Sequence, residues 1–226
     1  MKNLRRFLSE HKHFYLLILL LPVLIWFKYL EMTLIPKYII HTTLDDHIPF
    51  VKEFVVPYLL WFPYIAYGVL YTGVHSREDF CKLIIFLGGG MSVAYLVCMI
   101  FPNAQDLRPS ITQNDPFSVL VKLIYATDTP TNVCPSVHVI NAIAVNAALQ
   151  HSGAFAVKKY RKPCSHTLTI LICLSTVFIK QHSIVDVGWG IFAAALFYLW
   201  LYVFPNRKNK NGPLHNRKPH SVQIKE

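Results

Sequence analysis

Residues 80–101 read FCKLIIFLGGGMSVAYLVCMIF, a run of 22 residues in which Lys82 is the only charged side chain. A helix of about 20 apolar residues is long enough to cross the hydrocarbon core of a bilayer. The run therefore predicts a membrane-spanning helix and sets the class of the whole chain. Its three glycines, at 88–90, favour close packing against a neighbouring helix over a phosphate-binding loop, which would need a strand before it.

The rest of the chain repeats this pattern. Of its 226 residues, 54% are hydrophobic and only 15% are charged, which is typical of an integral membrane protein and not of a soluble domain. We expect an all-α fold, a six-transmembrane-helix bundle over residues 1–205, followed by a basic and disordered cytoplasmic tail over residues 206–226. No small-residue cleavage site follows the first apolar run, so we expect that run to be retained. The expected spans cover residues 14–35, 54–74, 80–101, 135–150, 167–180 and 185–204.

The distribution of positive charge predicts the topology. With six spans, 16 of the 22 Lys and Arg residues fall on the side that holds both termini, and five fall on the opposite side. Because loops rich in Lys and Arg stay in the cytoplasm, we expect both termini there, in a bacterial plasma membrane. The formal charge of +10 then reflects topology and contact with the lipid bilayer. We expect no nucleic-acid partner, since the chain offers no soluble basic domain.

Ionisable residues gather where the apolar runs meet polar loops. Residues 135–138 read Pro-Ser-Val-His at the start of the fourth span, and residues 182–186 read His-Ser-Ile-Val-Asp at the start of the sixth. The topology places both segments on the outer face, together with Arg108 after the third span. Placing an ionisable side chain at a membrane costs free energy, so residues of this kind are functional candidates. The spacing of His182 and Asp186 puts both on one helix face, where the carboxylate can fix the imidazole tautomer for a nucleophile or general base.

The other residues of this set suit a phosphate. The guanidinium of Arg108 offers the fork of donors that binds phosphate oxygens. Pro135 and Ser136 begin a helix whose free N–H groups can bind an anion, and His138 in its first turn can protonate a leaving oxygen. Lys180 is either a phosphate contact or an anchor at a helix end, and the sequence slightly favours the anchor. Each residue alone also has a structural interpretation, but together they predict phosphoryl transfer through a phosphohistidine.

Neither a metal site nor a disulfide framework is predicted. The five cysteines contain no Cys-x-x-Cys pair, and the eleven histidines contain no His-Glu-x-x-His motif. We therefore expect no metal and no other cofactor. The sequence leaves open a metal site built from residues far apart in the chain.

These motifs resemble those of the type-2 phosphatidic acid phosphatase superfamily, a group of integral membrane lipid phosphatases. The motifs of that family run Lys-x6-Arg-Pro, then Pro-Ser-Gly-His, then Ser-Arg-x5-His-x3-Asp. Phe101 stands here in place of the lysine, Val137 in place of the glycine and Thr176 in place of the arginine. The matching positions are Arg108, Pro109, Pro135, Ser136, His138, Ser175, His182 and Asp186.

The resemblance implies a role for each matching residue. His182 would be the nucleophile and Asp186 its partner. His138 would be the general acid, and Arg108 with Ser136 would bind the phosphate, without a metal. Two of the three cations that the family places at the phosphate are missing, which should weaken the stabilisation of its charge.

The expected function is hydrolysis of a membrane lipid phosphate or diphosphate. Phosphatidate, phosphatidylglycerophosphate and polyprenyl diphosphates are candidate substrates. A divergent branch of the family, which resembles sphingolipid head-group transferases, keeps the two histidines and the aspartate with looser flanking motifs, so transfer to a lipid alcohol is an alternative. A non-catalytic transporter or scaffold is a further alternative. The sequence leaves the lipid and the oligomeric state open.

Overall fold

The computed structural model describes residues 11–205, and almost all of its regular structure is helical. The predicted all-α class is confirmed, and each of the six apolar runs forms helix. The predicted disordered tail, residues 206–226, lies outside the described residues. The helices of the six runs are η1 (Lys12–Leu19) with α2 (Leu20–Thr33); η2 (Lys52–Phe54) with α4 (Val55–Leu59) and α5 (Trp61–His75); α6 (Arg77–Ile100); α8 (Val137–His151); α9 (Arg161–Phe178); and α10 (Ile184–Tyr198) with the π-helical η4 (Leu199–Val203).

Within the described residues, four helical segments are long and apolar enough to cross a membrane. In the first of them, only 6% of the apolar window is buried inside the protein. Ile25 and Met32 there leave 70% and 75% of their surface exposed. Large apolar side chains exposed along a whole helix are compatible with a lipid environment. The four segments are Lys12–Thr33, Lys52–His75, Arg77–Ile100 and Ile184–Val203.

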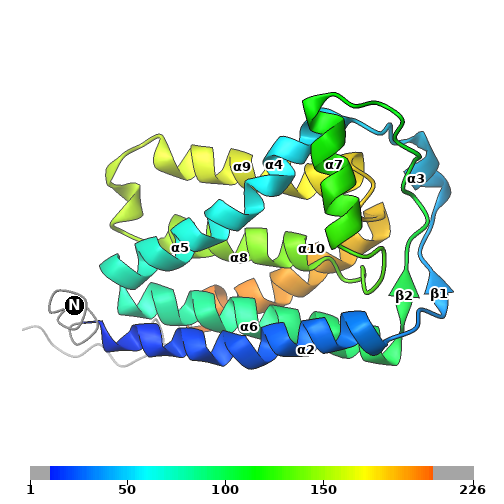
Figure 1. Cartoon of the computed structure of the whole chain (residues 1–226). Helices are drawn as coiled ribbons and strands as arrows, with labels where there is room; N and C mark the ends of the chain where they lie inside the picture. Colours follow the sequence, from blue (N-terminus) through cyan, green and yellow to red (C-terminus); the bar gives the residue numbers. More distant parts are fainter. Residues whose placement is uncertain (1–10, 206–226) are drawn as a thin grey trace, which may run out of the picture.

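The 15-residue helix α8 lies in the middle of the bundle, where it packs against α5, α6, α9 and α10 (Figure 1). Ile140 and Leu149 of α8 are fully buried. A Cβ on Gly90 of α6 would stand 2.5 Å from Ile140 Cγ2, so only glycine allows this close approach. The interpretation of this glycine as a packing residue is confirmed. Because protein and not lipid surrounds α8, this helix can be short and can contain polar residues.

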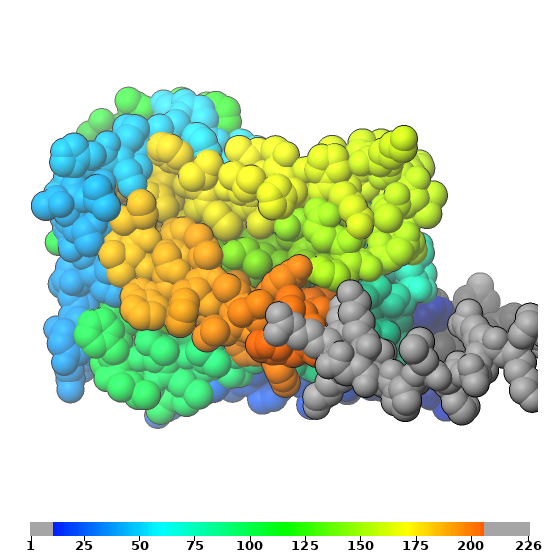
Figure 2. All heavy atoms as spheres, turned by 180° about the vertical axis from the view of Figure 1, so that it is seen from behind, coloured from blue at the N-terminus to red at the C-terminus, as the bar shows by residue number. Residues whose placement is uncertain are grey.

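The back of the molecule shows α9 and α10 side by side, with part of α8 visible between them (Figure 2). A short 3-10 turn, η3 (Phe155–Val157), precedes α9. α9 begins at Arg161, six residues before the predicted start at 167. One side of its polar first turns faces protein: the hydroxyl of Tyr64 in α5 lies 2.7 Å from Ser165 Oγ and 3.0 Å from Thr169 Oγ1.

Several elements outside the six predicted spans gather at one end of the bundle, the end at which α8 and α10 begin (Figure 1). They are α3 (Thr43–His47), α7 (Pro116–Thr127) and a parallel pair of two-residue strands, β1 (Tyr38–Ile39) and β2 (Asn103–Ala104). Asp115 caps α7 by accepting hydrogen bonds from two of its first N–H groups. Because α7 has only 12 residues, its apolar sequence falls short of a span, which is why the six-span prediction does not include it.

Candidate active site

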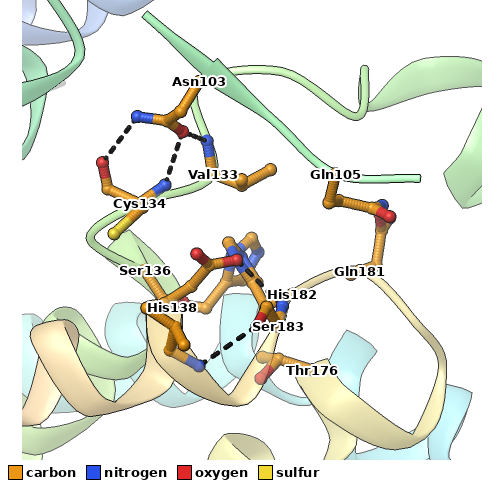
Figure 3. A network of polar contacts seen from close by, with 12 residues as sticks. Asn103, Gln105, Val133, Cys134, Ser136, His138, Thr176, Gln181, His182 and Ser183 are labelled. Atoms are coloured by element: carbon orange, nitrogen blue, oxygen red, sulfur yellow. Dashed lines mark hydrogen bonds and ion pairs between the residues drawn. The ribbon is translucent and has the colours of Figure 1, made fainter. Parts of the chain in front are cut away.

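The starts of α8 and α10 bring His138 and His182 into contact, although 44 residues separate them in sequence. The two nitrogens that face each other, His182 Nε2 and His138 Nδ1, lie 3.4 Å apart. On the other side of the same ring, His182 Nδ1 lies 3.4 Å from Asp186 Oδ2. Both separations are long for hydrogen bonds, and the second is an ion-pair contact. The three groups form a continuous chain of carboxylate, imidazole and imidazole. Figure 3 labels the two histidines of this chain.

Local capping holds this chain in place. Ser183 Oγ and the Asp186 carboxylate form a capping box at the start of α10, in which Asp186 Oδ2 accepts the Ser183 N–H at 2.9 Å. The imidazole of His182, one residue before this cap, therefore turns its Nδ1 toward a fixed carboxylate. A carboxylate at Nδ1 favours the tautomer with the proton on Nδ1, which leaves the lone pair of Nε2 available. The arrangement suits a nucleophilic Nε2.

The ring of His138 lies between two aromatic side chains from the second apolar run. Its centroid is 4.8 Å from that of Tyr58 and 4.6 Å from that of Trp61. The indole N–H of Trp61 also donates to the backbone carbonyl of His138 at 3.1 Å. Sequence analysis did not assign either aromatic residue to the site, because nothing distinguishes them from other aromatic residues of an apolar helix.

Ser136 joins the two helices that carry the histidines. Its backbone N–H donates to the carbonyl of Asp186 at 3.1 Å, and its Oγ accepts the N–H of Val139 at 3.5 Å as the N-cap of α8. The side chain is fully buried. A Cβ on Gly190 would stand 3.0 Å from the Ser136 carbonyl oxygen, so glycine lets α10 approach this point. Phosphate binding by Ser136 stays a prediction.

Arg108 lies between the end of α7 and the residue before His182. Its guanidinium donates to the carbonyls of Tyr125 at 3.1 Å and Asp128 at 2.7 Å, and to the side-chain oxygen of Gln181. It also lies over the Tyr125 ring, 4.6 Å from the centroid. Its Nε is buried and has no hydrogen-bond partner among residues 11–205. Arg108 is therefore at the candidate site, with its Nε donor unused.

The structure places Lys180 differently from the other predicted residues. Its Nζ donates to the backbone carbonyl of Asp45 at 2.6 Å, and the side chain is buried. Lys180 thus joins the end of α9 to α3, and both the anchor at a helix end and the phosphate contact stay predictions. The two residues that stand in place of the family's lysine and arginine supply no positive charge. Phe101 stacks on Tyr38 with 4.1 Å between the ring centroids, and the Thr176 hydroxyl donates to the carbonyl of Cys173.

Asp45 is a buried residue of this region that sequence analysis missed. Its carboxylate accepts hydrogen bonds from Ser183 Oγ at 2.7 Å, from the N–H of Ile184 at 2.8 Å, and from both the N–H and the hydroxyl of Thr42. Burial alone would raise the pKa of this carboxyl, but the hydrogen bonds outweigh burial and hold the pKa below its ordinary value. The capping-box pattern of Thr42 and Asp45 was the available sequence signal.

Two amide side chains after α6 hold the segments that carry the histidines (Figure 3). Asn103 Oδ1 accepts the N–H groups of Val133 and Cys134 at 2.8 and 2.9 Å, and its Nδ2 donates to the Cys134 carbonyl. Gln105 Nε2 donates to the carbonyl of Lys180 at 3.1 Å. The strand β2 and the residue after it thus fix the approach to both α8 and α10. The sequence signal was only that these polar residues follow a span.

Buried polar atoms without hydrogen bonds gather around His182. Within the described part of the chain they include Arg108 Nε, Gln181 Nε2, His182 Nδ1 and Asp186 Oδ1. Most buried polar groups in proteins are paired, so such a concentration marks a candidate functional site. No group of three or more His, Cys, Asp or Glu side chains among residues 11–205 is arranged to hold a metal ion, and metal independence stays a prediction.

Comparisons of the chain with protein-family models, with curated proteins and with solved structures gave no match.

Proposed function

We propose that this protein is a membrane lipid phosphatase that works through a phosphohistidine, as its resemblance to the type-2 phosphatidic acid phosphatases implies. The observation that carries the proposal is the contact chain from Asp186 through His182 to His138, with 3.4 Å at each step. A buried carboxylate, a histidine with a free nitrogen and a second histidine supply an orienting group, a nucleophile and a general acid.

In the proposed reaction, the lone pair of His182 Nε2 forms a bond to phosphorus while the bond from phosphorus to the lipid oxygen breaks. His138 gives its proton to the leaving oxygen. Water then attacks the phosphohistidine, His138 takes a proton from that water, and the nitrogen–phosphorus bond breaks to release phosphate. The facing nitrogens, 3.4 Å apart, are too close to hold a phosphoryl group between them, so the His138 ring must move within its aromatic surroundings when substrate binds.

Transfer to a lipid alcohol is the second candidate. Phe101 stacks on Tyr38 and Thr176 bonds to the carbonyl of Cys173, and neither carries a charge. Arg108, which bonds to Gln181 beside His182, is then the cation of the proposed phosphate site. Weaker stabilisation of phosphate charge is compatible with the divergent branch that the flanking motifs resemble. The two reactions share every step up to the phosphohistidine and differ only in the acceptor.

The proposed setting is a bacterial plasma membrane crossed six times. Four described segments satisfy the length and hydropathy of a span, and α8, which is packed within the protein, and α9, which packs on α8 and α4, would complete the six. The excess of Lys and Arg on the side of the termini supports an outward-facing site, which matches a membrane lipid as substrate.

The test is phosphate release from a panel of lipid phosphates in detergent micelles, with the lipid products followed at the same time. Wild type should turn over at least one lipid, in the presence of EDTA as well as without it, and His182→Ala should abolish turnover. His47→Ala is the matched control, because His47 is exposed in α3 and its Nδ1 contacts the carbonyl of Thr43. Full activity in folded His182→Ala would exclude the mechanism, and an inactive wild type would favour a transporter or scaffold.

A further inference from the structure

Asp128, the residue after α7, places a carboxylate against Tyr58, whose ring packs on His138, and the proposed reaction does not use it. Tyr58 donates its hydroxyl proton to Asp128 Oδ2 at 3.1 Å, and the same tyrosine ring packs against His138. The backbone carbonyl of Asp128 accepts from Arg108 Nη2 at 2.7 Å. Asp128 therefore contacts both a residue that holds the general acid and the arginine of the site.

The charges around Asp128 come from four parts of the chain. Burial is the largest influence and holds the pKa of the Asp128 carboxyl above its ordinary value. Glu31 of α2 also raises this pKa, whereas His182 before α10, Tyr58 of α4 and Arg108 after α6 lower it. The Asp128 carboxylate accepts the hydrogen bond of Tyr58, the Tyr58 ring lies 4.8 Å from the ring of His138, and His138 contacts His182, so two side chains separate the carboxylate from the nucleophile. A negative charge bound at His182 would therefore be close enough to be repelled by Asp128.

The positive charge available to oppose that repulsion is small. Lys180 Nζ is bonded to the carbonyl of Asp45, which leaves Arg108. The guanidinium of Arg108 already donates to two carbonyls at the end of α7, the negative end of the helix dipole. A phosphate with two negative charges would face this one cation and the carboxylates of Asp128 and Asp186. Because these two carboxylates already outnumber the guanidinium, each further negative charge on the phosphate adds repulsion, and a phosphate with one negative charge is repelled less than one with two.

We propose that Asp128 is a specificity-determining residue, which restricts the proposed phosphate site to a phosphate group with a single negative charge. Such a group is the phosphodiester of a lipid head group, or a monoester that brings one proton with it. This inference rests on the proposed function and narrows its substrate class. Asp128 makes no bond to the substrate in this scheme and acts through charge.

Two ligands with the same alkyl chain can distinguish the effect of phosphate charge from the effect of ligand shape. Dodecylphosphonic acid carries two negative charges above its second ionisation, and its monomethyl ester carries one at every neutral or basic pH. Neither contains the bond from phosphorus to a lipid oxygen that the proposed reaction breaks. Dissociation constants for the full chain in detergent can be measured by calorimetry as the pH rises from well below to well above the second ionisation of the acid.

Wild type should bind the ester with little pH dependence and should bind the acid at least about tenfold more weakly at the highest pH. Asp128→Asn keeps an acceptor for Tyr58 and removes the charge, so it should bind the doubly charged acid more tightly and lose most of the preference. Asp106→Asn is the matched control, because Asp106 is an exposed carboxylate paired with His41, and it should keep the wild-type preference.

The possible results separate this inference from the proposed function. An equal preference in wild type and Asp128→Asn would overturn the role of Asp128 and leave the phosphatase proposal standing. Tighter binding of the acid than of the ester by wild type at high pH would do the same, and it needs no variant to fold. Failure of wild type to bind either ligand would overturn both proposals.

Discussion

At the scale of single residues, the two nitrogens of His182 have different partners. Nδ1 faces the Asp186 carboxylate, and Nε2 faces His138. A neutral imidazole has one N–H donor and one lone pair, so the carboxylate decides which nitrogen is nucleophilic. Asp186 also caps α10, and its contribution to stability must be separated from its contribution to the reaction.

Asp186→Asn should leave a residual rate, at least about 100-fold below wild type, because the amide can hold the imidazole in the wrong tautomer while His182 remains. The side-chain oxygen of asparagine can still accept the Ser183 N–H, so the thermal midpoint should change little. Single-turnover phosphate release and thermal unfolding in detergent check the two statements. A large loss of stability with an unchanged rate per folded molecule would assign Asp186 to capping alone.

Arg108→Lys tests the guanidinium fork. Lysine keeps the charge but cannot donate to Tyr125, Asp128 and Gln181 at once. We expect kcat/KM to fall by at least about tenfold, or about 1.4 kcal/mol of transition-state stabilisation.

Lys180→Ala is the comparison for that result. Because Lys180 bonds to Asp45, its removal should lower the thermal midpoint more than the affinity for phosphate. If Lys180→Ala lost most of its kcat/KM with normal stability while Arg108→Lys kept nearly normal kcat/KM, the phosphate site would have to be assigned to Lys180 instead of Arg108.

At the scale of elements, the short helix α3 controls the start of α10, which is 139 residues away in sequence. The Asp45 carboxylate fills the N-terminus of α10, and its backbone carbonyl holds Lys180. An anion at a helix N-terminus is favoured by the helix dipole. Because Asp45 already occupies this terminus, the proposal places the substrate phosphate at the start of α8 instead.

Asp45→Asn should lower the free energy of unfolding by about 1–3 kcal/mol, because a charged acceptor of buried hydrogen bonds is lost. The folded-state pKa of Asp45 lies below its ordinary value, so its stabilisation is present above the unfolded pKa of about 3.9 and is lost as pH falls through the folded value. Wild type should therefore lose stability on acidification more steeply than Asp45→Asn. Asp46→Asn is the control, since Asp46 is exposed and contacts His41. Parallel acid profiles for Asp45→Asn and wild type would contradict the prediction.

At the scale of the whole molecule, the unequal distribution of Lys and Arg and the position of the histidines together predict which side of the membrane the candidate site faces. The site end of the bundle carries α3 and α7, and the loop between α8 and α9 lies at the other end (Figure 1). If the termini are cytoplasmic, the site faces outward.

In a cysteine-free background, Thr112→Cys should react with an impermeant thiol reagent added to intact cells. Lys159→Cys should react only after the cells are opened. Both positions are exposed, so accessibility in the protein does not limit either reaction. The background is needed because the native Cys164 is also exposed. The reverse labelling pattern would place the site in the cytoplasm and change the lipids to be tested.

Features set by neighbouring residues could be predicted from the sequence. Uninterrupted apolar length predicted the helical class and the positions of six helices, and the spacing of His182 and Asp186 predicted their contact. Tertiary packing alone decided that His138 meets His182, that Tyr58 and Trp61 enclose His138, and that Asp45 and Asp128 belong to this region. The physical reason is that helix length and side-chain periodicity are local properties, whereas these contacts join segments 44 to 139 residues apart. The close approach of helices at residues such as Gly90 and Gly190 determines which of these distant segments meet.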